Sequence, residues 1–81
     1  MRISVQFFSQ LREAVGASEQ TVELPATATV ADLLGRLYQQ YAELEKWDRH
    51  ILIGAGLEFV ERDHLLQAEE PIALMPPVQG G

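Results

Sequence analysis

One segment of this 81-residue chain, residues 30–43, has the pattern of a long amphipathic helix. Apolar residues in and directly after it recur every three or four positions, which places them on one side of a helix; they are Val30, Leu33, Leu34, Leu37, Tyr41 and Leu44. Thr29 is a favourable N-cap, and Asp32 lies near the positive end of the helix dipole. Because one such helix can cover one face of one sheet, the segment limits the chain to a small two-layer fold.

Five short segments are predicted to be strands, because their apolar residues alternate with polar ones or form short apolar runs. They are residues 2–8, 19–24, 51–53, 57–60 and 72–75. The run 72–75 is apolar at every position, which is typical of a strand at the centre of a sheet and buried on both faces. The order β-β-α-β-β-β therefore predicts an α+β domain with a mixed sheet packed against one main helix.

The connections between these elements carry turn signals. Residues 9–16 are expected to form one or two helical turns that stop at a glycine, and residues 44–50 form a polar connection after the main helix. Gly54-Ala55-Gly56 predicts a turn between the third and fourth strands. Residues 63–70 are expected to be a loop with a single turn near its centre.

The composition excludes several classes of protein. No cysteine is present, which removes disulfides, thiolate metal sites and a cysteine nucleophile. The net charge is −6, and the six basic residues are scattered rather than clustered as phosphate binding requires, so no nucleic-acid partner is expected. No apolar run approaches the roughly 20 residues that span a bilayer, and no signal-peptide pattern is present. We therefore expect a cytoplasmic protein with no membrane partner.

No catalytic, cofactor or metal site is indicated in the body of the chain. The two histidines, His50 and His64, have no second ligand at metal spacing. Gly54 and Gly56 do not belong to a dinucleotide-binding loop, because the third glycine position is Phe59 and no helix follows. We therefore expect this chain to bind no cofactor and no metal ion.

The C-terminal segment, residues 71–81, differs from the rest because none of its side chains is charged. A terminus that only frays in solvent is usually polar and charged, so this composition favours a segment that enters another molecule. We expect a domain of residues 1–75 followed by a flexible, extended tail of residues 76–81. At its longest, this six-residue tail reaches about 20 Å.

Each part of the tail has a physical role in this interpretation. Pro76 and Pro77 stop the last strand and direct the chain outward in an extended conformation. Val78 provides one apolar anchor. Gly80 and Gly81 carry no Cβ, so the backbone can lie in a channel too narrow for any side chain.

At these residues the chain resembles a known family, the small sulfur-carrying subunits of molybdopterin synthase, which have a ubiquitin-like β-grasp fold. The most specific part of the resemblance is the tail, Pro76-Pro77-Val78-Gln79-Gly80-Gly81. Residues 7–16 resemble the first strand and following turn of that family, and residues 29–34 resemble its helix start. The resemblance covers essentially the whole chain.

The resemblance implies a mechanism based on the C-terminal carboxylate. A ubiquitin-activating-like adenylyltransferase would adenylate Gly81 with ATP and magnesium, and sulfur from a persulfide donor would convert it to a thiocarboxylate. The tail would then enter the large catalytic subunit, in a heterotetramer, and transfer sulfur to cyclic pyranopterin monophosphate to form the molybdopterin dithiolene. ATP and magnesium would be bound by the activating partner, and the chain would have no active site of its own.

The resemblance also implies roles for individual residues. Gly81 would carry the sulfur, and the residues that give access and position the tail would be Gly80, Gln79, Val78, Pro77 and Pro76. Exposed apolar residues near the last strand would dock the partner, and the candidates are Phe8, Leu74 and Met75. Three alternatives remain: a sulfur carrier for thiamin or another pathway, a ubiquitin-like modifier joined to lysine, and a plain β-grasp binding module.

Overall fold

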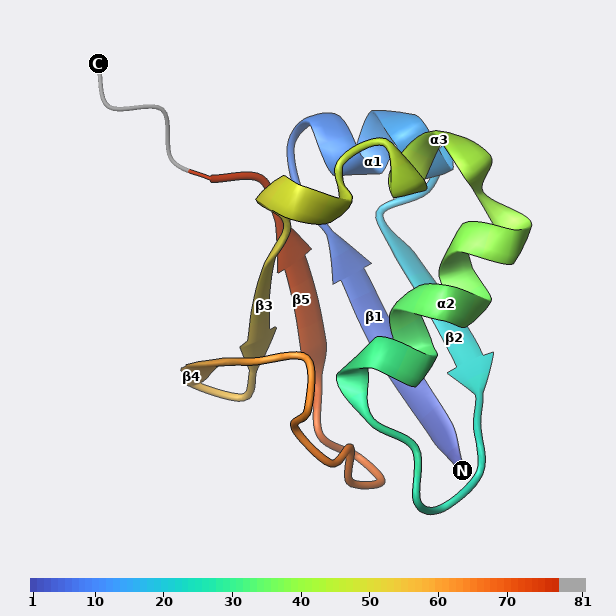
Figure 1. Cartoon of the computed structure of the whole chain (residues 1–81), viewed down its shortest axis with the longest axis vertical. Coiled ribbons are helices and arrows are strands. Elements are labelled where there is room, and N and C mark those ends of the chain that lie inside the picture. Colours follow the sequence, from blue (N-terminus) through green and yellow to red (C-terminus); the bar gives the residue numbers. More distant parts are fainter. Residues whose placement is uncertain (78–81) are drawn as a thin grey trace.

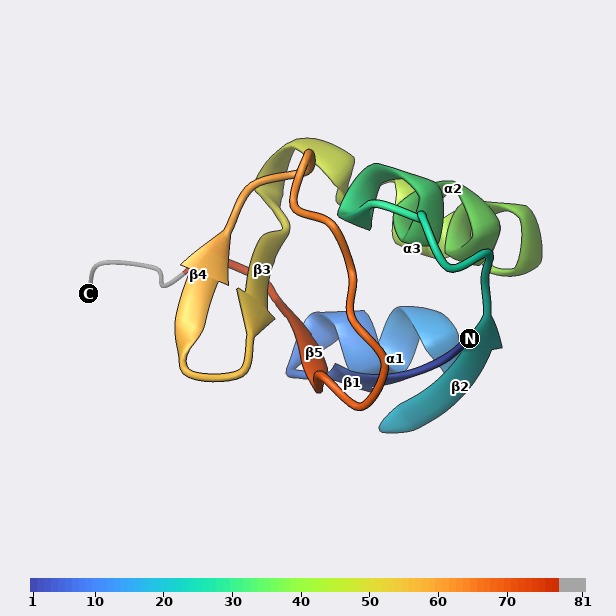
Figure 2. The same ribbon diagram turned by 90° about the horizontal axis from the view of Figure 1, so that it is seen from below.

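The computed structural model describes residues 1–77, which form a five-stranded sheet with its helices packed on one side (Figures 1 and 2). The elements in chain order are β1 (Arg2–Phe7), α1 (Gln10–Val15), β2 (Glu19–Glu23), α2 (Val30–Gln40), α3 (Ala42–Glu45), the 3-10 turn η1 (Asp48–His50), β3 (Leu52–Ala55), β4 (Glu58–Val60) and β5 (Ile72–Met75). The strand order is β2-β1-β5-β3-β4, with β1 and β5 parallel and the other pairs antiparallel. This mixed sheet with one main helix is the ubiquitin-like β-grasp, so the predicted fold class is confirmed.

Helix α2 begins at Val30, directly after the predicted N-cap Thr29. The Asp32 N–H donates to Thr29 Oγ1 at 3.3 Å, and the Thr29 N–H donates to Asp32 Oδ2 at 2.9 Å, which is a complete capping box. The N–H groups of the first two helical residues donate to the carbonyl oxygens of His64 and Arg62 at 3.0 and 2.9 Å. The loop after β4 therefore satisfies backbone donors that a helix start leaves free.

The helix ends earlier than the apolar pattern predicts. Residues 30–43 were expected to be one helix, but α2 ends at Gln40 and the backbone of Tyr41 leaves the helical region at φ −129° and ψ 87°. A separate turn, α3, follows. The break redirects the chain so that Leu44 is completely buried in the core and Tyr41 packs partly against it. The tertiary packing of these two side chains is therefore the reason that the helix breaks at Tyr41 instead of continuing straight to residue 43.

The hairpin between β3 and β4 also differs from the prediction. The glycine-rich turn was expected at residues 54–56, but Gly54 and Ala55 belong to β3, where Gly54 pairs with Phe59 on one side and Ala73 on the other. The turn comes later, at Gly56, whose φ of 62° is accessible to glycine without strain. Pairing with two neighbouring strands thus holds Gly54 in the sheet despite its low strand propensity.

Strand β5 occupies the centre of the sheet, between β1 and β3, as predicted. Its burial was expected on both faces, and this is wrong for one of them. Ile72 and Leu74 are buried beneath the helices, whereas Ala73 and Met75 point to the other face and are partly exposed. The reason is that the chain has helices for only one face. The expected turn within the loop 63–70 is also corrected, because Leu65 there forms an isolated antiparallel bridge with Thr29.

Truncation of Leu74 is expected to be strongly destabilising. Leu74 lies in the central strand and is 0% exposed, so Leu74→Ala should lower the free energy of unfolding by about 2–5 kcal/mol, through lost burial and a cavity. Met75→Ala, one residue further along the same strand, should cost clearly less because Met75 is only partly buried. Urea unfolding of both variants measures the difference, and equal losses would contradict the assignment of faces.

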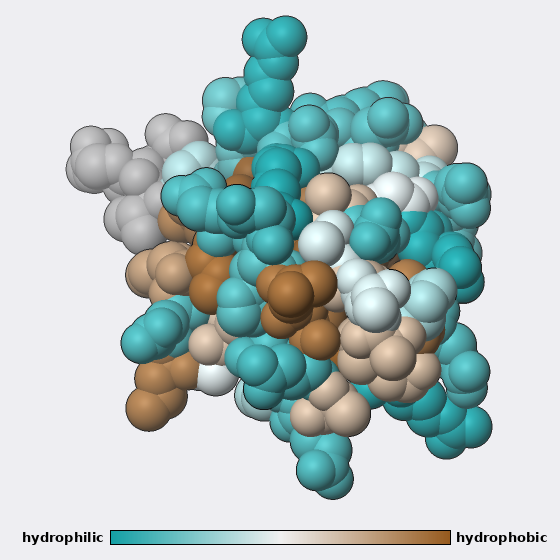
Figure 3. Space-filling view, turned by 60° about the horizontal axis from the view of Figure 1, so that its bottom comes forward, coloured by the Kyte–Doolittle hydropathy of each residue, from teal (hydrophilic) through white to brown (hydrophobic). Residues whose placement is uncertain are grey.

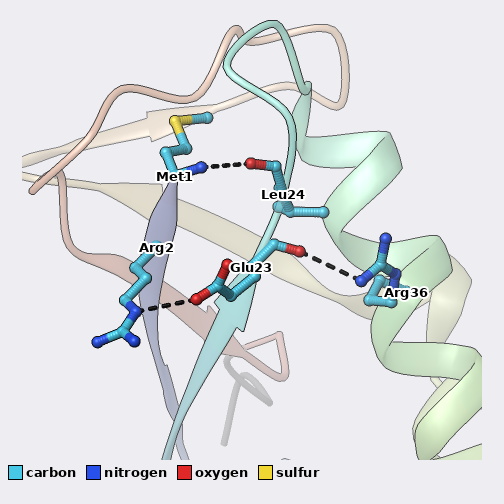
Figure 4. A network of polar contacts seen from close by, with 5 residues as sticks. All are labelled: Met1, Arg2, Glu23, Leu24 and Arg36. Atoms are coloured by element: carbon cyan, nitrogen blue, oxygen red, sulfur yellow. Dashed lines mark hydrogen bonds and ion pairs between the residues drawn. The ribbon is translucent and has the colours of Figure 1, made fainter.

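The free edge at β2 is fastened to its neighbours by polar contacts (Figure 4). Arg2 Nε of β1 donates to Glu23 Oε1 of β2 at 3.0 Å, and Arg36 of α2 donates to the Glu23 carbonyl oxygen at 3.2 Å. The backbone amino group of Met1 donates to the carbonyl oxygen of Leu24 at 2.5 Å. Because the Arg2–Glu23 ion pair is largely exposed, it contributes little to stability. Together, however, the three contacts join the β2 edge of the sheet to β1 and to α2.

Candidate functional site

The root of the C-terminal tail lies at the end of the central strand (Figure 1). β5 pairs with β3 as far as the Leu52–Met75 pair, and Pro76, which has no N–H, follows directly. Pro76 and Pro77 are half-buried. The remaining predicted site residues lie outside the described part of the chain; they are Val78, Gln79, Gly80 and Gly81. The described residues therefore fix where the tail starts and what surrounds its start.

One face of the sheet is not covered by a helix, and we call it the open face. α2 and α3 lie on the opposite side of the sheet (Figure 2). Side chains alternate between the two faces along each strand, so neighbours of the buried Phe7, Ile53 and Leu74 point to the open face. Met75, which directly precedes Pro76, points to this face, so the open face adjoins the root of the tail.

The part of the open face beside the tail is apolar. Leu52 pairs with Met75, and Gly54 pairs with both Phe59 and Ala73, so these residues share one face of β3, β4 and β5. The N–H of Phe8 donates to the Leu74 carbonyl oxygen at 3.1 Å, which continues the ladder past β1 and places Phe8 beside this group. We name the group the open-face patch, and its members are Phe8, Leu52, Gly54, Phe59, Ala73 and Met75.

The open-face patch combines large exposed side chains with small ones. Phe59 is 71% exposed, Phe8 43% and Leu52 38%. A Cβ added at Gly54 would stand 3.4 Å from the Met75 Cε atom and 3.7 Å from the Ala73 Cβ atom, so the centre of the patch is already filled. Exposed aromatic and aliphatic groups around a closed centre are suited to docking against an apolar protein surface.

The other half of the open face, over β1 and β2, is polar. Arg2 pairs with Glu23 there, and Ser4 Oγ donates to Glu19 Oε2 at 3.2 Å. Figure 3 views a different side of the molecule, its lower end and its helix side, where hydrophilic residues predominate and hydrophobic residues form small separate groups. The open-face patch is therefore set apart by its neighbours as well as by its composition.

The structure corrects the predicted docking residues in part. Leu74 is completely buried, because alternation along β5 turns it toward the helices, and it has no surface to offer a partner. Phe8 and Met75 do lie on the open face.

Leu52 and Phe59 were not predicted, and they join Phe8 and Met75 only through strand pairing. For Leu52 a local signal was available, because it lies between the buried Ile51 and Ile53 and therefore points away from them. For Phe59 no local signal was available, because its face is set by the pairing with Gly54.

Other chemistry in the described residues is limited. Within residues 1–77, no group of three or more histidine or acidic side chains could hold a metal ion. His64 Nε2 lies 2.9 Å from Glu70 Oε1, so these two residues pair with each other in the loop before β5. None of the helices in that same range is long and apolar enough to cross a membrane.

Comparison with known proteins identifies the family. A family model described as the ThiS family matches residues 5–81. The chain belongs to the ThiS family. This match includes the tail, and it confirms the resemblance that the tail and the helix start indicate.

Two curated ThiS-like relatives carry the same name, molybdopterin synthase sulfur carrier subunit. The one from Escherichia coli is 32% identical over 81 residues, covering 98% of this chain and 99% of the relative. The one from Chlamydomonas reinhardtii is 31% identical over 84 residues and covers 100% of both chains. The relatives are therefore alike in length as well as in sequence.

Solved structures show the same fold. SAMP1 from Haloferax volcanii matches with a TM-score of 0.86 and 26% identity, covering 100% of both chains. A chain from the protein–protein complex of subunits 1 and 2 of the molybdopterin-converting factor of Helicobacter pylori matches with a TM-score of 0.72 and 21% identity, again over 100% of both chains. At that lower identity the second likeness concerns the fold alone.

Proposed function

We propose that this ThiS-family chain is the sulfur-carrier subunit of a molybdopterin synthase. The observation that carries the proposal is the position of the tail root, where Pro76 and Pro77 end the central strand directly beside the open-face patch. A partner that docks on the patch would therefore hold the tail at its own active site. Two curated relatives with this name, each covered almost completely, support the proposal.

In this proposal the reactive group is the C-terminal carboxylate of Gly81. Its oxygen displaces pyrophosphate from ATP, and the sulfur of a persulfide donor then displaces AMP from the acyl carbon. A thiol cleaves the resulting acyl disulfide, which leaves a thiocarboxylate on Gly81. The thiocarboxylate then gives its sulfur to cyclic pyranopterin monophosphate, and water restores the carboxylate.

The other residues of the chain position this group. Residues 1–75 act as the folded domain and residues 76–81 as the inserted tail. Pro76 and Pro77 aim the tail, Val78 and Gln79 seat it, and Gly80 gives the backbone access to a narrow channel. A chain that carries an activated acyl group also benefits from having no cysteine, since a thiol would compete for it.

Two protein partners follow from this proposal. The large catalytic subunit would bind the open-face patch and receive the tail, and the name of the two curated relatives, which makes each a subunit of a molybdopterin synthase, supports this partner. A ubiquitin-activating-like adenylyltransferase would bind the same tail and supply ATP and magnesium. Because activation consumes ATP, we place the protein in the cytoplasm.

A second function, as a ubiquitin-like modifier, is favoured by one observation. SAMP1, with the same fold over its whole length, is named in a related structure as a small archaeal modifier protein. A modifier would end in an isopeptide bond between Gly81 and a lysine of a target, without transfer of sulfur. The two functions share the activated carboxylate and differ in what attacks it.

The mass of the protein isolated from its own cells distinguishes these functions. A sulfur carrier should appear partly with one oxygen replaced by sulfur, and it should copurify with a large synthase subunit. Lysine-linked adducts without a thiocarboxylate form would instead identify a modifier. Thiocarboxylate without the large subunit would point to thiamin synthesis or another sulfur pathway, and would overturn the molybdopterin assignment.

A further inference from the structure

The half of the sheet that carries the open-face patch has no long helix beneath it. Figures 1 and 2 show α2 lying over β1 and β2, whereas the segments on the helix side of β3 and β5 are η1, at one end of β3, and the loop that follows β4. The inner side of this hairpin buries only a few small or medium side chains, among them Ile53 and Ala55. Because η1 and the loop after β4 bury so few apolar side chains here, we expect polar contacts to contribute to fixing their conformation.

Three side chains from three different segments meet beside this hairpin. Tyr38 Oη of α2 donates to Asp48 Oδ1 of η1 at 2.5 Å, and Arg62 Nη1, from the loop after β4, donates to the same oxygen at 2.9 Å. Arg62 Nη2 also donates to the backbone carbonyl oxygen of Asp48. We call these three residues the Asp48 cluster.

Arg62 extends the cluster to the start of the main helix. Its own carbonyl oxygen accepts the N–H of Ala31 at 2.9 Å, so this one residue is bonded both to the first turn of α2 and to η1. Asp48 precedes β3 by four residues, and Arg62 follows β4 by two. The cluster therefore ties the two chain segments that enter and leave the β3–β4 hairpin to the same helix.

The pKa shifts of Tyr38 and Asp48 agree with a fixed arrangement of the Asp48 cluster. Burial and the hydrogen bond to Asp48 raise the pKa of Tyr38, and the hydrogen bond from Tyr38, followed by that from Arg62, lowers the pKa of Asp48. The Asp48 carboxylate and the Tyr38 hydroxyl thus stay in their bonded forms around neutral pH. A charge-assisted bond shared by two donors is stronger and more directional than a neutral one.

We propose that the Asp48 cluster positions the β3–β4 hairpin, and with it Leu52 and Phe59, for docking of the partner protein. Within the described residues, the contacts of the Asp48 cluster join α2, η1 and the loop after β4, so the cluster would act on docking through the hairpin. The docking part of this inference rests on the proposed function, whereas the effect on the hairpin concerns the free protein alone. The two parts are therefore tested separately.

Amide hydrogen exchange on the free protein tests the effect on the hairpin. In Tyr38→Phe and Arg62→Met, the amides bonded between β3 and β4 should exchange about tenfold faster, while those between β1 and β2 keep their rates. The matched control is Arg2→Met, which removes an arginine–carboxylate pair from the opposite edge and should leave the hairpin unchanged. Equal acceleration in all strands, or none in the hairpin, would overturn the inference.

Binding to the large subunit of the molybdopterin synthase from the same organism tests the effect on docking. Arg62→Met should weaken binding about tenfold, mainly by slowing association of a hairpin that no longer holds one orientation, and Arg62→Lys, which keeps one charged bond, should recover part of it. Wild-type affinity in Arg62→Met together with faster hairpin exchange would overturn the docking role. If the wild-type chain does not bind at all, the proposed function fails, while the exchange result still decides the effect on the hairpin.

Discussion

Replacing Gly81 by Val is expected to abolish sulfur transfer and to leave the free energy of unfolding unchanged. The proposed chemistry takes place at the Gly81 carboxyl carbon, and a β-branched side chain there would block a channel that accepts only backbone. Because Gly81 follows the last strand by six residues in the sequence, the substitution leaves every residue of the core unchanged. Intact mass after incubation with the activating enzyme, ATP and the sulfur donor measures loading, and molybdopterin formation measures transfer.

Two matched variants make this result specific. Adding one Ala after Gly81 should have the same effect, because it displaces the carboxylate by one residue without changing the domain. Gly35→Val should retain the transfer, since it adds the same side chain at an exposed position of α2 where no atom lies within 4 Å of the added Cβ. A Gly81→Val chain that loads and delivers sulfur at the normal rate would refute the proposed role of the tail.

Replacing Phe8 and Phe59 together by Ser should weaken binding of the large subunit by about a hundredfold or more. Both are aromatic, exposed and part of the open-face patch, and central aromatic residues of an interface commonly contribute about 2 kcal/mol or more each. Their exposure in the free protein means that the fold should tolerate the change. Calorimetric titration measures the affinity, and thermal unfolding verifies the fold.

The control for this prediction is Leu65→Ser. Leu65 is 59% exposed, comparable to Phe59, but it lies in the loop beside the start of α2 and pairs with Thr29. Its replacement should leave the affinity within about twofold, as is usual for residues outside the energetic centre of an interface. If Leu65→Ser weakens binding as much as the aromatic pair does, docking takes place on the helix side and the open-face assignment is wrong.

The sequence was a good guide to elements with a local cause. The start of α2 was predicted from Thr29 and Asp32, which form the capping box, and the stop of α1 from Gly16, whose φ is 83°. The end of the main helix was not predictable in the same way. The break at Tyr41 depends on the burial of Leu44 against other elements, and the helical spacing of apolar residues carries no information about that packing.

The candidate site was likewise predictable where its residues are neighbours in sequence, and not where they are brought together by tertiary contacts. The tail could be proposed as the site from the chain itself, because Pro76, Pro77 and the two terminal glycines are close together in sequence. Of the three candidate docking residues, Phe8 and Met75 lie on the open face, whereas Leu74 is buried. Phe59 could not be placed, since its position depends on pairing with Gly54, a residue that the pattern assigned to a turn.

The sequence alone thus determined the class of fold and the start of the main helix, and it supplied the proposal that the C-terminus is the reactive end of the chain. These depend on local patterns: periodicity, capping, and residues whose backbone properties do not depend on their neighbours. Only the tertiary structure decided which face of the sheet stays open and which side chains form its apolar patch. It also decided which polar side chains meet beside the hairpin, because strand register and the contacts among Tyr38, Asp48 and Arg62 join distant parts of the chain and no local pattern specifies them.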